Sequence, residues 1–204
     1  MLSEEMCDKL KRNDFSRIYG GGTPVERHRK EILIDRATIA ARVAEMGQQI
    51  TRDYPEVSRP LVVISILKGA IPFTADLIRA IDRPLRLETM VASSYGSGTV
   101  SSGKVNIKYR SFDDLSGCDV ILVDDIIDSG NTLAAIKRTI ADFQPASVAT
   151  CVFLNKPERR EVEMPIDYMG MDVPDVFVIG YGLDYDGQYR ELADICAVVF
   201  EEEE

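Results

Sequence analysis

Between residues 61 and 154 the chain alternates between largely apolar segments and segments that mix apolar with polar residues. Four largely apolar segments, 61–67, 85–92, 119–123 and 147–154, have the length and composition of strands. Apolar runs without polar alternation are typical of strands buried on both faces of a parallel sheet. The pattern therefore predicts a parallel sheet that is covered by helices on both faces.

Helical periodicity predicts three helices around these strands. The first follows a short strand at 32–34, begins after Asp35, which can cap it, and ends at Tyr54. The second spans 71–81 with a proline in its first turn, and the third spans 131–143. The residues of the first and third helices that we expect to face the core are Ile39, Val43, Met46, Ile50, Leu133, Ile136, Ile140 and Phe143.

The length and the apolar content allow one well-packed domain. A chain of 204 residues that is 45% apolar is too short for two large domains. We expect an α/β fold with a central, mainly parallel sheet flanked by helices, formed by residues 25–204. Residues 1–24 are charged and end in a glycine-rich stretch, so we interpret them as an N-terminal extension or arm. A phosphate-binding glycine loop is the alternative there, but no strand precedes it.

Charge and residue usage exclude several classes of function. A net charge of -10 argues against nonspecific nucleic-acid binding, which needs Lys and Arg. No apolar run approaches the roughly 20 residues of a membrane span, and the start lacks the layout of a secretory signal, so we expect a soluble, cytoplasmic protein. Four cysteines without a CxxC pair and a single histidine, His28, predict neither a disulfide framework nor a zinc site. Catalysis must then rest on carboxylates, Lys, Arg, backbone groups and a metal.

The segment 121–133, ILVDDIIDSGNTL, carries the most informative chemistry. A buried strand ends in two acids, Asp124 and Asp125, which can accept hydrogen bonds from ribose hydroxyls or hold the water shell of a magnesium ion. A short turn before a helix follows, and its backbone N–H groups can surround a phosphate. The turn consists of Asp128, Ser129, Gly130, Asn131 and Thr132.

Acids and glycine also follow strands simply as caps and turns. That alternative is reasonable for any one of these residues, but capping a single helix does not require three acids behind a buried strand. The segment contains neither GxxxxGK[ST] nor GxGxxG, so it is not a Walker A loop or a dinucleotide fingerprint.

The segment resembles the phosphoribosyl pyrophosphate loop of the type I phosphoribosyltransferases. Further segments extend the resemblance, in chain order, over roughly residues 30 to 200. Residues 67–70, LKGA, look like the family's pyrophosphate loop, and 93–98, SSYGSG, look like its mobile lid. Lys156 and the stretch 177–190, FVIGYGLDYDGQYR, look like the purine-binding and closing segments of hypoxanthine phosphoribosyltransferases.

The resemblance implies a fold and an activity. It implies the type I phosphoribosyltransferase fold with a small hood from the terminal segments. It implies transfer of the 5-phosphoribosyl group from phosphoribosyl pyrophosphate to hypoxanthine or guanine, which yields IMP or GMP and pyrophosphate in purine salvage. It also implies magnesium as cofactor and a homodimer or homotetramer.

Roles at the purine follow from the resemblance position by position. Asp128 is the implied general base at purine N7, and Lys156 is the implied donor to the 6-oxo group. Phe177 would stack on the purine with Ile126 on its other face. Val178 would offer its backbone carbonyl to the edge of the base.

The resemblance also assigns the remaining site residues. The set implied for phosphoribosyl pyrophosphate is Lys68, Gly69, Ser94, Tyr95, Asp124, Asp125, Asp128, Ser129, Gly130, Asn131, Thr132 and Arg190. The metal set is Asp124, Asp125 and Asp184, and Asp184 is also counted with the purine-binding segment. Many relatives carry Glu-Asp where this chain has two aspartates, which keeps the charge but shortens the first acid.

Each of these roles has an ordinary alternative. Lys156 could be a surface lysine, Phe177 a core aromatic residue and Asp184 a turn residue. Rival functions are a xanthine or pyrimidine phosphoribosyltransferase, a regulator that senses phosphoribosyl pyrophosphate and binds nucleic acid, and a receiver-type signalling domain. The receiver is disfavoured because its acid pair belongs near the first strand.

Overall fold

The structure is a computed structural model that describes residues 28–94 and 105–200. The chain divides into two compact units. One is Lys30–Val198, and the other combines Met1–Arg29 with Val199–Glu204. Most of the second unit, including the extension predicted at 1–24, lies outside the described residues.

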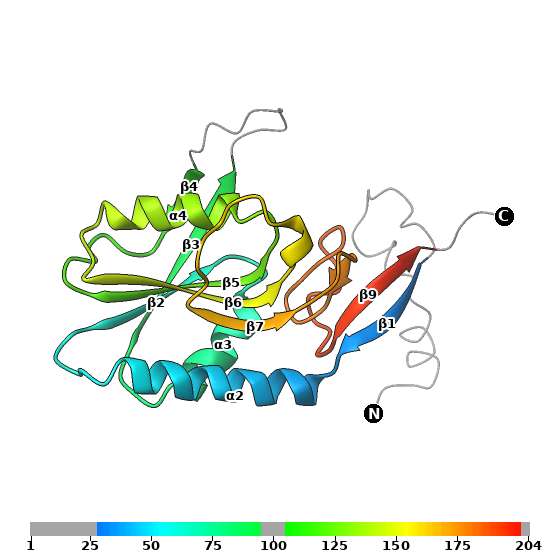
Figure 1. Ribbon diagram of the computed structural model, residues 1–204, viewed down its shortest axis with the longest axis horizontal. Helices are drawn as coiled ribbons and strands as arrows, with labels where there is room; N and C mark the ends of the chain where they lie inside the picture. The colour runs from blue at the N-terminus through cyan, green and yellow to red at the C-terminus, as the bar shows by residue number, and fades with distance from the viewer. Residues whose placement is uncertain (1–27, 95–104, 201–204) are drawn as a thin grey trace, which may run out of the picture. The chain divides into compact units, whose positions relative to one another are not determined.

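A six-stranded sheet in the order β4-β3-β2-β5-β6-β7 forms the centre of the larger unit (Figure 1). All neighbouring strands run parallel except β3 and β4, which are antiparallel. The mainly parallel sheet is therefore confirmed. Its strands are β2 (Leu61–Ile66), β3 (Arg86–Ser94), β4 (Val105–Arg110), β5 (Asp119–Ile127), β6 (Ser147–Asn155) and β7 (Tyr168–Asp172).

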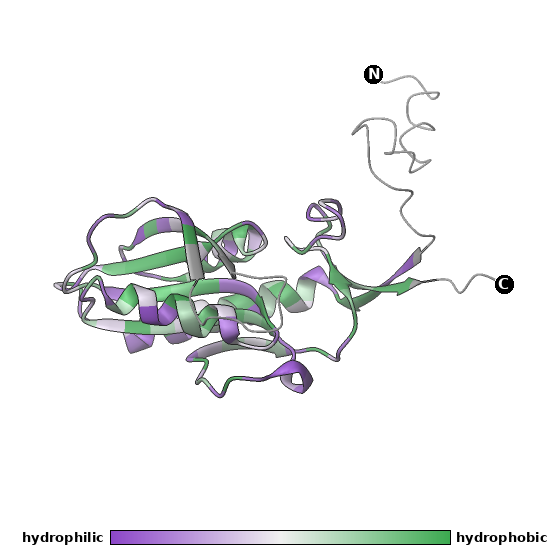
Figure 2. Ribbon diagram, turned by 90° about the horizontal axis from the view of Figure 1, so that it is seen from above, coloured by the Kyte–Doolittle hydropathy of each residue, from purple (hydrophilic) through white to green (hydrophobic). Residues whose placement is uncertain are grey.

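Helices cover both faces of this sheet. Helices α2 (Arg36–Asp53) and α3 (Ile71–Ala80) pack on one face, and α4 (Asn131–Ala141) packs on the other (Figure 1). Strands β2, β5 and β6 are apolar along most of their length, whereas the helices carry both apolar and polar residues (Figure 2). Within β5 the side chains alternate between two cores. Ile121 contributes to the core under α2 and α3, and Leu122 contributes to the core under α4.

The predicted helix signals are confirmed. The backbone N–H of Thr38 donates to the side chain of Asp35 at 2.8 Å, so Asp35 caps α2. The core-facing positions of α2 and α4 are buried, and Phe143 packs against the α4 core although α4 itself ends at Ala141. Within the described ranges, no helix has both the length and the apolar character that a membrane crossing requires.

A second, three-stranded sheet with the order β1-β9-β8 is built mainly from the first and last described segments. Its strands are β1 (His28–Ile34), β8 (Val178–Ile179) and β9 (Ile195–Phe200). The strand predicted at 32–34 is therefore longer than expected. This sheet corresponds to the small hood that the resemblance implied for the terminal segments.

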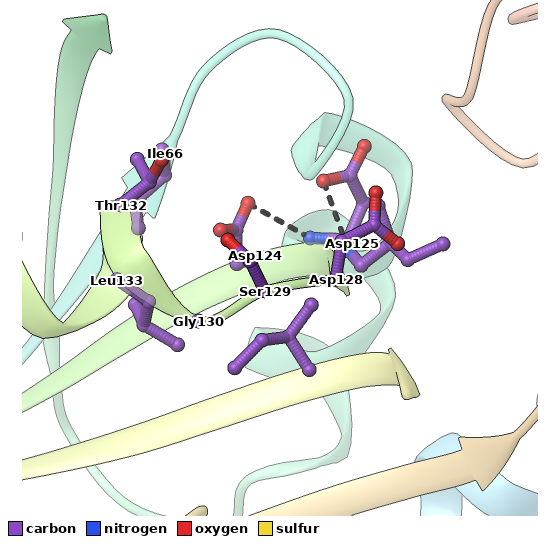
Figure 3. A pocket seen from close by; sticks show the side chains of 10 residues that line it. Ile66, Asp124, Asp125, Asp128, Ser129, Gly130, Thr132 and Leu133 are labelled. Atoms are coloured by element: carbon purple, nitrogen blue, oxygen red, sulfur yellow. Dashed lines mark hydrogen bonds between the residues drawn. The ribbon is translucent and has the colours of Figure 1, made fainter. Parts of the chain in front are cut away.

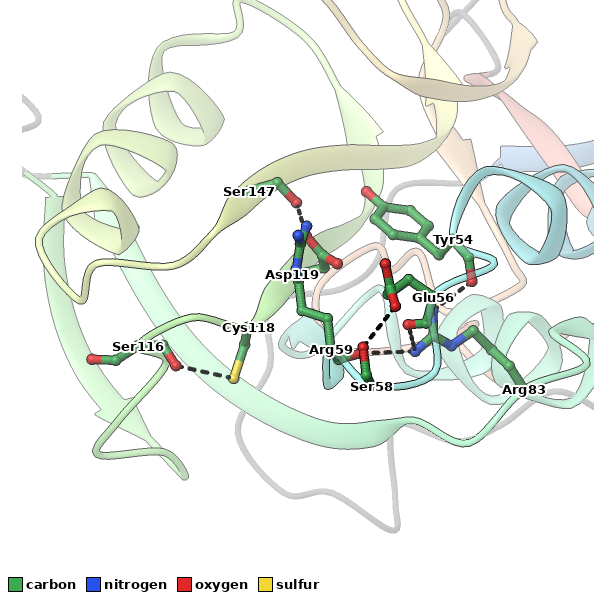
Figure 4. A network of polar contacts seen from close by, with 9 residues as sticks. All are labelled: Tyr54, Glu56, Ser58, Arg59, Arg83, Ser116, Cys118, Asp119 and Ser147. Carbon is green, nitrogen blue, oxygen red and sulfur yellow. Dashed lines mark hydrogen bonds and ion pairs between the residues drawn. The ribbon is translucent and has the colours of Figure 1, made fainter.

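Polar contacts hold the loops at the end of the central sheet where β5 and β6 begin (Figure 4). Asp119 at the start of β5 is buried and accepts hydrogen bonds from Ser147, at 2.6 Å, and from Arg59, at 3.3 Å. Arg83 donates to the backbone carbonyls of Tyr54, at 2.5 Å, and Arg59, at 3.0 Å. These contacts hold the loops at the amino ends of β5 and β6. The carboxyl ends of these strands lie at the opposite end of the sheet.

Candidate active site

The acid pair lies where β5 ends, in the position expected for ligand binding in a parallel α/β sheet (Figure 3). The backbone N–H of Asp125 donates to Asp124 at 3.1 Å, and that of Ile126 donates to Asp125 at 3.0 Å. Both carboxyl groups therefore stay at the strand end. They border a hollow whose lining residues are Ile66, Asp124, Asp125, Ile126, Ile127, Asp128, Ser129, Gly130, Thr132 and Leu133.

Enclosure at the end of the sheet makes the charged forms of this pair costly. Burial raises the pKa of Asp124 well above its ordinary value, and the neighbouring charge of Asp125 raises it further. Burial also raises the pKa of Asp125, while hydrogen bonds and the positive charge of Arg190 oppose that rise. Two adjacent acids with raised pKa values favour a ligand that brings positive charge or hydroxyl donors.

The predicted pyrophosphate loop lies directly against this pair. Lys68 is exposed and follows a cis peptide bond after Leu67, and Gly69 is buried. A Cβ atom on Gly69 would lie 1.6 Å from Oδ2 of Asp125. Glycine is therefore the one residue that fits here without displacing the carboxylate.

The predicted closing segment packs on the same loop. Gly182 has a positive φ of 101°, and a Cβ atom on it would lie 2.0 Å from the carbonyl oxygen of Gly69. The side chain of Arg190 donates to the carbonyl of Gly182 at 2.6 Å and forms an ion pair with Asp184 at 2.6 Å. The positive charge of Arg190 therefore opposes the rise that burial causes in the pKa of Asp125, while its guanidinium group pairs with Asp184.

The three acids predicted for the metal do not form a preassembled cluster. Asp184 is held by Arg190 and accepts the backbone N–H of Gly187 at 2.8 Å. Among the described residues, no group of three or more His, Cys, Asp or Glu side chains is arranged to hold a metal ion. The arrangement suits an ion that takes one or two carboxylates from the protein and its other ligands from a bound phosphate compound.

The predicted phosphate turn is held by the segment after β6. Gly130 has a φ of 84° and is the N-cap residue of α4, and both Gly130 and Thr132 line the hollow. The carbonyl of Ser129 accepts the backbone N–H groups of Glu161, at 3.0 Å, and Val162, at 3.1 Å. Asn131 donates from its side chain to Glu161 at 2.7 Å. Hydrogen bonds with the segment after β6 therefore hold the turn between β5 and α4 in place.

Asp128 follows the acid pair and is the first residue of this turn. Its Oδ1 atom is buried and has no hydrogen-bond partner among the described residues. Buried acceptors are nearly always paired, so such an atom calls for a donor from outside the protein chain. The backbone carbonyl of Asp128, by contrast, is fixed by the Nε–H of Arg160 at 3.1 Å.

Lys156 is buried, with 6% of its surface exposed, so the alternative of an ordinary surface lysine is wrong. Its backbone N–H donates to the carbonyl of Ile127 at 3.0 Å, which places it beside the end of β5. Its Nζ atom lies 3.8 Å from Asp175, which forms a closer pair with Arg159 at 2.6 Å. A buried ammonium group with one distant partner has donors left for a ligand.

Phe177 is 45% exposed, so the alternative of a buried core aromatic residue is also wrong. Its ring packs edge to face with Tyr185 at a centroid distance of 5.4 Å. Val178 is buried and pairs with Ala197 in the small sheet. Of the described residues that the resemblance assigned to the purine, Ile126 lines the hollow, whereas Lys156, Phe177, Val178 and Asp184 stand outside its lining.

Two predicted residues belong to the segment between β3 and β4. Ser94 is the last residue of β3, and Tyr95 lies outside the described residues, as does most of the predicted lid. Arg160 and Glu161, which hold the phosphate turn, were not predicted. No local pattern marks them, because their partners lie 32 and 30 residues away in the chain.

Comparison with known proteins gives a consistent result. Residues 29–186 match the family model of the phosphoribosyl transferase domain. The hypoxanthine phosphoribosyltransferase of Salmonella typhimurium is 42% identical over 177 residues, which are 87% of this chain and 99% of that protein. The hypoxanthine-guanine phosphoribosyltransferase of Mycobacterium bovis is 45% identical over 170 residues, which are 81% of this chain and 84% of that protein.

Solved structures agree with the sequence relatives. A hypoxanthine-guanine phosphoribosyltransferase from Bacillus anthracis superposes with a TM-score of 0.78 at 40% identity and covers 83% of this chain and 99% of its own. A hypoxanthine phosphoribosyltransferase from Trypanosoma cruzi, a mutant in a ternary substrates complex, superposes with a TM-score of 0.79 at 40% identity and covers 84% and 96%. The chain therefore belongs to the phosphoribosyltransferase family and, within it, is similar to the hypoxanthine phosphoribosyltransferases.

Proposed function

We propose that this chain transfers the 5-phosphoribosyl group from phosphoribosyl pyrophosphate to hypoxanthine or guanine, which yields IMP or GMP and pyrophosphate in purine salvage. One observation carries the proposal. A buried carboxylate oxygen of Asp128, the first residue of the turn after the acid pair, has no partner among the described residues. A purine base would supply the missing donor through its N7–H group, which becomes more acidic as another ring nitrogen bonds to the ribose.

The 5-phosphate of the sugar would bind in the turn between β5 and α4. Backbone N–H groups at the start of a helix attract a phosphate through hydrogen bonds and the helix dipole. Ser129 and Thr132 line the hollow there and add hydroxyl donors. Gly130 and Asn131 complete the turn.

The ribose and the pyrophosphate would bind beside the acid pair. Asp124 and Asp125 would accept hydrogen bonds from the ribose hydroxyls, and the backbone at Lys68 and Gly69 would hold the pyrophosphate, assisted by Arg190. The close approach of Gly69 to Asp125 supports this assignment, because it would bring the pyrophosphate and ribose contacts next to each other. Ser94 and Tyr95 remain the predicted lid contacts to the same substrate.

Two adjacent carboxyl groups with raised pKa values fit a divalent cation that the substrate also coordinates. Asp124 and Asp125 would hold magnesium, directly or through water, and Asp184 would contribute from the closing segment. When bound, magnesium neutralises the charge that develops on the leaving pyrophosphate.

Cleavage at C1 of the ribose makes the sugar ring positive and the leaving group negative, as in glycoside hydrolysis. Asp128 would take the N7 proton of the purine, and Lys156 would donate to the 6-oxo oxygen. Ile126 and the exposed ring of Phe177 would enclose the two faces of the base, and the carbonyl of Val178 would meet its edge. Lys156 favours an oxopurine over adenine because an ammonium group can only donate.

Two further properties belong to the same proposal. We expect a cytoplasmic protein, because Cys118, Cys151 and Cys196 are free and buried, as thiols are in reducing compartments. We also expect a homodimer or homotetramer whose ligands are phosphoribosyl pyrophosphate and a purine base rather than nucleic acid.

The test is pyrophosphate release from phosphoribosyl pyrophosphate with hypoxanthine, guanine, xanthine, adenine and uracil supplied one at a time, with and without magnesium. Magnesium-dependent release with hypoxanthine or guanine would support the proposal and rank the bases. Release with xanthine or uracil alone would replace it by one of the rival transferases. Binding of phosphoribosyl pyrophosphate without release for any base would make a non-catalytic sensor the better reading.

A further inference from the structure

The backbone of Asp128 is fixed by Arg160, a residue that has itself been given no contact with substrate above. Arg160 follows the short 3-10 helix η2 (Pro157–Arg159) and reaches back to the end of β5. Its Nε–H donates to the carbonyl oxygen of Asp128 at 3.1 Å. One oxygen of the Asp128 carboxylate, the buried Oδ1 atom, has no hydrogen-bond partner in the described part of the chain.

Arg160 is itself held at its other end. Its Nη2 group donates to the side-chain oxygen of Asn155, which is buried at the end of β6. The amide nitrogen of Asn155 donates to Asp172 at 2.7 Å, and these two residues are aligned neighbours on β6 and β7. The guanidinium group is thus one link in a chain of hydrogen bonds from β7 to the backbone of Asp128.

The stem of Arg160 also packs against the phosphate turn. A Cβ atom on Gly130 would lie 3.3 Å from Cδ of Arg160, which is tighter than ordinary contact. Glu161 and Val162 continue the contact by donating to the carbonyl of Ser129. Arg160 therefore contacts the chain both at Asp128 and at the turn that follows it.

We propose that Arg160 is a positioning residue that sets the direction of the Asp128 carboxylate through its backbone carbonyl. The inference rests on the proposed function, because it concerns the base of that reaction. Arginine suits the role because its planar fork can bond two acceptors at fixed angles, here the carbonyl of Asp128 and the amide of Asn155.

A double-mutant cycle between Arg160 and Asp128 tests this role. Arg160→Met keeps most of the stem and removes both bonds, and we expect it to lower kcat about tenfold or more, because small misplacements of catalytic groups are costly. In an Asp128→Asn background the same change should lower kcat less than about twofold, because the group that Arg160 positions is already inactive. Urea unfolding checks that all four proteins are folded.

Equal fold-losses in the two backgrounds would mean that Arg160 supports the fold in general, and an unchanged kcat in Arg160→Met would also overturn the inference. An inactive wild type would overturn the proposed function and this inference together. Arg52→Met, at the exposed end of α2, is the matched control for removing an arginine. If Arg160→Met does not fold, Arg160→Lys replaces it, with the same pattern and a smaller loss expected.

Discussion

Gly69 and Asp125 approach each other so closely that a methyl group on the Cα atom of Gly69 would overlap the carboxylate, at 1.6 Å from Oδ2. Gly69 lies in the loop after β2, and Asp125 lies near the carboxyl end of the neighbouring parallel strand β5. The close approach joins the loop proposed for pyrophosphate to the acid proposed for ribose and magnesium. The absence of a side chain at position 69 therefore makes room for the Asp125 carboxylate.

The methyl group added in Gly69→Ala should displace the side chain of Asp125, because the two would otherwise overlap. We expect a loss of about 1–3 kcal/mol in the free energy of unfolding from overpacking. The kcat/KM for phosphoribosyl pyrophosphate should fall by about 10²-fold, because a carboxylate moved by roughly 1 Å no longer meets its ligand. Gly117→Ala is the control, since a Cβ atom there meets nothing within 4 Å. Wild-type kinetics in Gly69→Ala would show that Asp125 does not need its present position.

Asp128→Asn should lower kcat much more than it lowers substrate affinity. An amide keeps the shape of the carboxylate but cannot accept a proton, and a positioned base contributes at least about 10²-fold to the rate. Steady-state kinetics combined with calorimetric binding of phosphoribosyl pyrophosphate would separate the two effects. Asp142→Asn, at the exposed far end of α4, is the control. Equal kcat in Asp128→Asn and wild type would remove Asp128 from the role of base.

Lys156→Met should weaken catalysis without weakening the fold. The change removes a buried ammonium group, but Asp175 keeps its closer partner Arg159 at 2.6 Å, so no buried charge is left alone. Loss of a charged hydrogen bond to the 6-oxo group should raise the activation free energy for hypoxanthine by about 1.5–3 kcal/mol. This corresponds to a fall in kcat/KM of roughly 10- to 150-fold. Kinetics and thermal unfolding would be measured on the same samples.

Arg159→Met is the matched variant for this experiment. It removes the exposed partner of Asp175 and leaves Lys156 in place. Retained activity in Arg159→Met, together with a loss in Lys156→Met, would assign the effect to the lysine. A comparable loss in both variants would instead point to the ion pairs of Asp175.

Stability should depend on pH through Asp194. The side chain and backbone N–H of Arg36 donate to Asp194, and these bonds lower the pKa of Asp194 below its ordinary value. A lowered pKa in the folded state stabilises the fold above about pH 4, and this contribution disappears as the pH falls further. Asp194→Asn should therefore destabilise the protein at pH 7, and the difference from wild type should shrink towards pH 3.

Urea unfolding at pH 7, 5 and 3 would measure this difference. Asp113→Asn is the control, because its fully exposed carboxylate lies 3.9 Å from Arg110. A difference for Asp194→Asn that stays constant across this range would contradict the linkage to its titration.

Much of the fold could be predicted because each element carries its own local signal. The apolar runs of β2, β5 and β6 and the cap at Asp35 are such signals. Strand β4 was missed, although Val105, Ile107 and Tyr109 alternate with polar residues, because its six residues give only three repeats of that alternation. The short strands β7 and β8 have still fewer residues from which a period can be read.

The site likewise contains residues that a local sequence pattern reveals and residues that it does not. The segment 121–133 could be recognised because its acids and its turn are contiguous in the chain. The contacts of Gly69 with Asp125 and of Arg160 with Asp128 join residues that are far apart in sequence, so no spacing in a single sequence reveals them. The pairing of Asp184 with Arg190 is likewise a product of the folded backbone around Gly182.

The unpartnered oxygen of Asp128 also bears on how the protein would respond to selection. A buried acceptor without a donor costs roughly 1–3 kcal/mol of stability, which is a large share of a domain's total. An apolar residue of similar size at position 128 would recover part of that cost. A laboratory evolution experiment that rewards heat resistance alone should therefore enrich inactive variants at this position, and heat resistance and turnover would have to be selected together to keep Asp128.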